Sequence, residues 1–111
     1  MKFQRIFLLV LLASEIAFAK SYTKDEIKKM VSKKKYPKLG VVQVSDKEFP
    51  MDACEKFVSE QRVGFAEEGW PVKILKESVD LVIVEAWGQN SKTTFKCEDG
   101  RIRIEGQDYE I

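Results

Sequence analysis

The sequence contains no histidine and only two cysteines among its 111 residues. Without histidine, the chain cannot form a Ser-His or Cys-His nucleophile pair or a His-ligated metal site. The two cysteines stand far apart, which also excludes a Cys-x-x-Cys redox or zinc motif. The familiar designs of small enzymes and metal centres are therefore excluded, and we expect no catalytic residues, no metal site and no cofactor.

Glycine, proline and long apolar runs are also scarce. Six glycines and three prolines exclude collagen-like and low-complexity chains. The longest unbroken apolar run covers residues 6–13, whereas roughly 20 residues are needed to span a bilayer. We therefore expect no transmembrane segment in the mature chain. With 44% hydrophobic and 33% charged residues, the composition is typical of one small globular domain.

The first 19 residues are typical of a cleaved export signal. Lys2 and Arg5 give a positive start, the apolar run follows, and residues 17–19 (Ala-Phe-Ala) form an A-x-A cleavage site. An uncleaved membrane anchor is the alternative, but the apolar run is too short for one. We predict that residues 1–19 are removed, that the mature chain begins at Lys20, and that the protein is secreted or periplasmic.

An oxidising destination favours a structural disulfide between Cys54 and Cys97. An even pair of cysteines in a small secreted chain is most often a bridge, and only one pairing exists here. The bridge would close a loop of about 44 residues, for which the chain-entropy model gives roughly 4 kcal/mol. A reactive thiol pair is the alternative, but such pairs usually stand close together in the sequence.

Charge divides the mature chain into two parts. Residues 20–38 hold eight lysines against two carboxylates, a net charge of +6, whereas residues 39–111 carry −6. We predict a basic helical arm at 20–38 and a disulfide-stapled domain at 39–111. The candidate anion-binding residues are the lysines of the arm: Lys28, Lys29, Lys33, Lys34, Lys35 and Lys38.

Residues 24–34 of the basic arm predict a helix, capped by Thr23 or Ser21 and ended by Pro37. Its apolar positions form a narrow stripe with i, i+3, i+4 spacing. The stripe consists of Ile27, Met30 and Val31. We expect the arm to be held by this stripe and by electrostatic attraction to the acidic domain, without deep burial.

The rest of the chain predicts an α+β fold. Residues 39–44 favour a short strand, followed by a polar turn at 45–48. Apolar residues at helical spacing, Cys54 among them, predict a core helix at 51–66. After residue 71 the period changes to two, which predicts a four-stranded antiparallel meander over 72–75, 81–87, 92–97 and 101–105. One disulfide would join the core helix to this sheet.

Residues 99 and 100 (Asp-Gly) predict the tightest joint of the meander. Asp-Gly favours a type I′ hairpin, because both central residues of that turn need a positive φ. In this register Cys97 lies opposite Ile102 and Phe95 lies opposite Ile104. One face of the hairpin is then apolar and contains a cysteine, so we expect the core helix to pack on it.

The strand at 81–87 is apolar on both faces. If the following loop covers four residues, 88–91, Val82 and Val84 join the core; a loop one residue longer reverses the faces. The second face then carries Leu81, Ile83 and Trp87, which the narrow stripe of the basic arm would cover only in part. We therefore expect Trp87 to be partly exposed and take Leu81, Ile83 and Trp87 as the candidate partner surface.

Glu85 is the most suggestive carboxylate for catalysis, because it stands in an otherwise apolar strand. A cross-strand ion pair with Lys92 or Lys96 explains it more simply. A glycosidase would also need a second carboxyl group at a defined separation, which nothing in the sequence fixes. We therefore expect that the protein is not an enzyme.

Three functions remain open on these observations. The leading hypothesis is a small secreted or periplasmic non-catalytic module that binds or inhibits another exported macromolecule, such as an exported protein. The first alternative is an envelope-surface binder that uses the lysine-rich arm on anionic lipid or polymer. The second is a carboxylate-dependent hydrolase. Because the protein is exported, no nucleic-acid partner is expected.

Overall fold

The computed structural model describes residues 20–110, so the predicted export signal lies outside the described residues. Within this range the chain forms two helices and five strands. They are α2 (Lys24–Ser32), β1 (Leu39–Glu48), α3 (Met51–Glu67), β2 (Val72–Glu77), β3 (Leu81–Trp87), β4 (Ser91–Glu98) and β5 (Arg101–Tyr109). The predicted α+β fold is confirmed, and the short strand expected before the core helix is a full member of the sheet.

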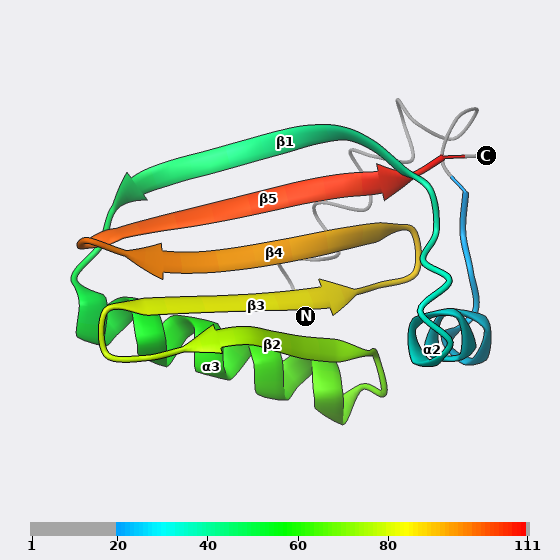
Figure 1. Cartoon of the computed structure of the whole chain (residues 1–111), viewed down its shortest axis with the longest axis horizontal. Coiled ribbons are helices and arrows are strands. Elements are labelled where there is room, and N and C mark those ends of the chain that lie inside the picture. Colours follow the sequence, from blue (N-terminus) through cyan, green and yellow to red (C-terminus); the bar gives the residue numbers. More distant parts are fainter. Residues whose placement is uncertain (1–19, 111) are drawn as a thin grey trace.

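The five strands form one antiparallel sheet in the order β1-β5-β4-β3-β2. Figure 1 shows α3 crossing behind one face of this sheet, and α2 standing beside the end where β3 and β5 finish. Helix α3 packs against β2, β3, β4 and β5. The sheet therefore has one face covered by α3 and an opposite face, called here the open face.

Strand β1 is longer than the sequence predicts. Residues 45–48, predicted as a turn, continue the strand, and Val44 and Glu48 pair with Glu105 and Arg101 of β5. That prediction is wrong because β1 is an edge strand exposed on both faces, where polar side chains carry no desolvation cost. The chain turns only at Phe49, directly before α3.

The hairpin between β4 and β5 follows the prediction. Asp99 has φ 52° and Gly100 has φ 69°, the left-handed conformation that a type I′ turn requires. Cys97 pairs with Ile102 and Phe95 with Ile104, so the predicted register is confirmed.

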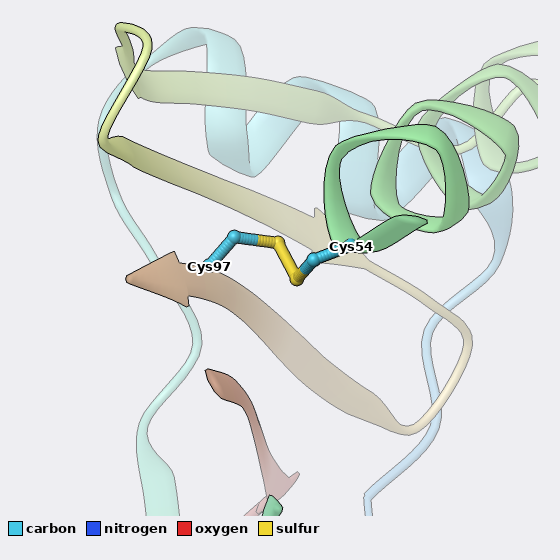
Figure 2. Close-up of a disulfide and its surroundings, with 2 residues drawn as sticks. All are labelled: Cys54 and Cys97. Carbon is cyan, nitrogen blue, oxygen red and sulfur yellow. A yellow bond between two sulfur atoms is a disulfide. The ribbon is translucent and has the colours of Figure 1, made fainter. Parts of the chain in front are cut away.

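The main core lies between α3 and the covered face. Its buried members are Cys54, Val58, Val82, Val84, Phe95, Cys97 and Ile102. The predicted disulfide is confirmed: it joins Cys54 of α3 to Cys97 of β4 with their Cα atoms 6.0 Å apart (Figure 2). Val82 and Val84 face α3 as predicted, because the four-residue loop at 88–91 sets that register.

Helix α2 begins with a reciprocal capping box. The N–H of Thr23 donates to Glu26 Oε1 at 2.9 Å, and the N–H of Glu26 donates to Thr23 Oγ1 at 3.1 Å. The hydrogen bond from the N–H of Thr23, together with the Thr23 side chain, favours the charged carboxylate and lowers the pKa of Glu26 below its ordinary value. Of the two predicted caps, Thr23 is therefore the one used.

The end of α2 comes earlier than Pro37. The helix finishes at Ser32, and Lys34 adopts the left-handed conformation with φ 58°. The N–H of Lys35 donates to the carbonyl oxygen of Met30 at 2.9 Å, and that of Lys34 to Val31 at 3.1 Å. This is the Schellman pattern, in which two end carbonyls of a helix are satisfied by the turn that follows.

Candidate functional site

A second buried cluster fixes the basic arm to the sheet. Ile27, Trp87 and Tyr109 are 0%, 2% and 0% exposed. Partly buried apolar residues surround them: Tyr22, Met30, Val31, Leu39 and Trp70. Strand alternation places Trp87 on the open face, so α2 covers one end of that face.

The expected partial exposure of Trp87 is wrong. In addition to α2, Tyr36 stacks on the indole ring, with centroids 5.6 Å apart and planes 17° from parallel. Lys92 Nζ lies 5.4 Å from the same ring. The candidate partner surface at Leu81, Ile83 and Trp87 therefore presents only Leu81 and Ile83, which are half-buried.

The basic arm is held differently from the expectation. Ile27 is fully buried, and the arm forms backbone bonds with the C-terminal end of the sheet: the N–H of Lys20 donates to Tyr109 and that of Glu110 to Lys38. Within residues 20–110, the one ion pair from the arm to the domain joins Lys38 to Glu110 at 3.4 Å. Apolar packing and backbone bonds, more than charge attraction, position the arm.

The six predicted lysines of the arm are all exposed. They form what we call the lysine surface: Lys28, Lys29, Lys33, Lys34, Lys35 and Lys38. Apart from Lys38, none of them makes an ion pair with a described residue. Because Ile27 and Pro37 are buried on either side of Lys33, Lys34 and Lys35, the backbone that carries these charges is anchored at both ends.

The rest of the open face is mainly a ladder of charges. Glu85 forms an ion pair with Lys92, as the simpler interpretation of this carboxylate predicts, and both side chains are 15% exposed. Neighbouring pairs are Lys96 with Glu98, Arg101 and Arg103 with Asp46, and Arg103 with Glu105. A polar ladder of this kind explains why the open face tolerates water without a covering helix.

A groove of about 450 Å³ lies between α3 and the loop that joins β2 to β3. Its floor is apolar, with Val58, Val82 and Val84, and its rim includes Glu55 and Arg62. The sequence did not predict this groove. Its one sequence signal is Val79, an apolar residue in the polar turn between two strands, which is 89% exposed at the rim.

No group of three or more Cys, Asp or Glu side chains within residues 20–110 is placed to hold a metal ion. In the same part of the chain, no helix has the length and apolar character needed to cross a membrane. Comparison of the chain with protein-family models, curated proteins and solved structures finds no match. Within residues 20–110, the lysine surface and the groove are candidate binding sites.

Proposed function

We propose that the protein is a small non-catalytic binding module that acts after export and uses the lysine surface to bind an anionic envelope surface. The main support for this proposal is a set of five exposed lysines that make no ion pair with a described residue. They lie on a segment anchored by the buried Ile27. A cluster of free cations attracts lipid headgroups or anionic polymers, and each lysine near a charged membrane contributes about 1 kcal/mol.

Anchoring makes the surface more than a solvated tail. Tyr36 is stacked on Trp87, and Pro37 is buried, so the lysines at 33–35 are carried on a segment with fixed ends. A fixed array loses less conformational entropy on binding than a flexible tail with the same charge. This arrangement supports binding of a surface that presents many negative charges together.

Lys34 adds support from its backbone. Its left-handed conformation is one in which glycine is the usual residue, and another residue there costs roughly 1–2 kcal/mol. A charged residue at a strained backbone position supports a use of that charge in binding.

The proposed export is supported by the disulfide between Cys54 and Cys97, since structural disulfides form and persist in oxidising compartments. The predicted signal at residues 1–19 would take the chain to such a compartment.

The test uses the mature, oxidised protein and vesicles with or without phosphatidylglycerol. A triple variant, Lys33→Gln, Lys34→Gln and Lys35→Gln, should bind anionic vesicles roughly a hundredfold more weakly, at about 1 kcal/mol per lysine. The matched control, Lys56→Gln, Lys73→Gln and Lys76→Gln, removes the same charge elsewhere and should bind like the native protein. A sulfated polysaccharide, tested in parallel, distinguishes a polymer from a lipid target.

Binding through the lysine surface should also weaken steeply with added salt, because screening shortens to about 8 Å at physiological ionic strength. Equal losses in the two triple variants would overturn the proposal. Binding that ignores salt, or no binding to either anionic probe, would overturn it too.

A second candidate function is binding or inhibition of another exported protein through the groove beside α3. The groove has an apolar floor, and Val79 stands at its rim with 89% of its surface exposed. In a pull-down from exported proteins, the immobilised native chain should retain a partner protein that the immobilised Val79→Asp variant does not retain. The control is Leu75→Asp, because Leu75 is also an exposed apolar residue, at 48%, and does not line the groove. Identical retention by both variants would count against this function.

A further inference from the structure

Among residues 20–110, no strand lies beside the outer edge of β1. Strand β1 stands at the end of the sheet order and pairs with β5 alone, and residues 41–48 are all exposed. Figure 1 places β1 at the edge of the sheet farthest from β2, while α3 lies below β2 and β3. An edge of this kind presents a row of backbone N–H and C=O groups to any extended chain that reaches it.

The two edges of the sheet differ in how they resist pairing. Strand β2 has six residues, three of them charged, and a register shift next to Leu75. Charges and bulges are the usual protection of an edge strand. Strand β1 has ten residues; its three charges lie at the end, 46–48, and its register shift lies before Val42, so residues 42–45 carry neither protection. The longest stretch of edge without charge or register shift is therefore residues 42–45 of β1.

Three valines make this edge apolar as well as long. Val41, Val42 and Val44 are 88%, 41% and 48% exposed. The regular part of the strand begins at Val42, because the pairing with β5 shifts register between Leu39 and Val42. Val42 and Val44 point to the same face, since their partners Gln107 and Glu105 stand two residues apart on β5.

The strand is complementary to itself in the antiparallel direction. If a twofold axis passes near Gln43, Val42 of one copy lies opposite Val44 of the other, and the reverse pair repeats the contact. Lys38 directly precedes β1 and Glu48 ends it, whereas Asp46 already pairs with Arg101 and Arg103. Antiparallel pairing about this axis therefore sets Lys38 of each copy opposite Glu48 of the other.

We propose that two copies of the chain pair through their β1 edges about this twofold axis, which joins the two sheets into one continuous sheet. The contact is isologous and uses each outer edge once, so it closes at the dimer. Main-chain hydrogen bonds and the two Val42–Val44 pairs hold it, and the Lys38 and Glu48 ends set its direction.

The test measures the oligomeric state of the mature, oxidised protein by sedimentation over a range of concentrations. Two double variants share Val44→Lys and differ at one position. Val42→Lys with Val44→Lys sets like charges opposite each other across the axis, and the dimer should weaken by about tenfold or more. Val42→Glu with Val44→Lys sets opposite charges there, and the dimer should persist. Both substitutions lie on half-exposed positions, so the melting temperatures should stay close to the native value.

Leu75→Lys is the control on the other edge, because Leu75 of β2 is as exposed as Val44. This variant should dimerise like the native protein. Slower amide hydrogen exchange of residues 42–45 at higher protein concentration should locate the contact on β1. A native chain that stays monomeric up to about 100 µM, a range that includes weak biological dimers, would overturn the proposal. Equal dissociation of the two double variants, or dissociation of Leu75→Lys, would also overturn it.

Discussion

Tyr36 lies parallel on Trp87, with ring centroids 5.6 Å apart, and so joins the end of the basic arm to the end of β3. Tyr36 is 42% exposed, whereas Trp87 is 2% exposed. Tyr36 therefore covers the second buried cluster on its solvent side, and Trp87 lies at the centre of the cluster. This relationship makes Trp87 a core residue and turns its expected role in binding into a role in stability.

Replacement of Trp87 by alanine should destabilise the protein by about 3–5 kcal/mol, the usual cost of truncating a buried aromatic side chain. Urea unfolding of the oxidised mature protein measures this change. Tyr36→Ala removes only the ring that covers Trp87, and it should lower the free energy of unfolding by about 0.5–1.5 kcal/mol. If the Trp87→Ala variant unfolds at the same urea concentration as the native protein, the structure of this cluster is contradicted.

We expect the exported protein to begin at Lys20 and to contain no free thiol. The intact mass of the protein tests both expectations. Replacing both Cys54 and Cys97 by alanine should destabilise it by about 2–5 kcal/mol, because the unfolded chain regains the freedom that the bridge removes. Urea unfolding with and without reductant checks the value, since reduction should affect the native protein alone. A chain that starts at Met1, or that holds two free thiols, would show that the predicted processing is wrong.

Local rules predicted most of the domain around α3. The turn residues Asp99 and Gly100, the alternation of β4 and β5, and the position of Cys97 all required the same register, and the structure has that register. Agreement among independent local signals is what allows a sequence to specify a fold, and it is strongest in this hairpin.

The predictions failed where one part of the chain is placed by another that is distant in sequence. The burial of Trp87 depends on Tyr36 and Ile27, which lie 51 and 60 residues earlier and meet it only after the chain folds. The predicted β5 ended at residue 105, yet the strand continues to Tyr109, a fully buried residue. Its strand-forming signal is weak because Gly106 and Asp108 have low β propensity, and pairing with β1 and β4 overrides it.

Tyr109 predicts a loss of stability in alkali. Burial, with a smaller contribution from the nearby Tyr22, raises the pKa of its hydroxyl well above the ordinary value, and this hydroxyl donates to the carbonyl oxygen of Gly88 at 2.9 Å. In the unfolded chain a tyrosine ionises near pH 10. Stability from Tyr109 is therefore fully present below pH 10 and falls as the pH rises toward the raised pKa, by about 1.4 kcal/mol per pH unit.

The measurement compares urea unfolding of the native protein and Tyr109→Phe between pH 7 and pH 11. At pH 7 the variant should be less stable, by about 1 kcal/mol for the lost hydrogen bond. Above pH 10 the two curves should converge, because phenylalanine does not ionise. Curves that stay parallel up to pH 11 would show that Tyr109 does not keep its proton in the folded state.

Lys34 offers a substitution that should raise stability and lower binding at once. Its backbone has φ 58°, and an L-residue in this conformation costs roughly 1–2 kcal/mol, whereas glycine avoids the clash but loses about 0.5–1 kcal/mol through its freer unfolded state. Lys34→Gly should therefore stabilise the protein by about 0.5–1 kcal/mol in urea unfolding. The same change should weaken binding to anionic vesicles, because it removes one charge of the lysine surface.

Lys34→Ala separates the two effects. Alanine removes the same charge as glycine, so Lys34→Ala should bind the vesicles as weakly as Lys34→Gly. Because alanine keeps a Cβ atom, the free energy of unfolding of Lys34→Ala should be about 1 kcal/mol lower than that of Lys34→Gly. The difference in stability between the two variants then gives the cost of a Cβ atom in this backbone conformation. Their common loss of affinity gives the contribution of the charge to binding. If both variants bind as tightly as the native chain, the lysine at this turn has no part in the lysine surface. If alanine is as stable as glycine, residue 34 is not left-handed.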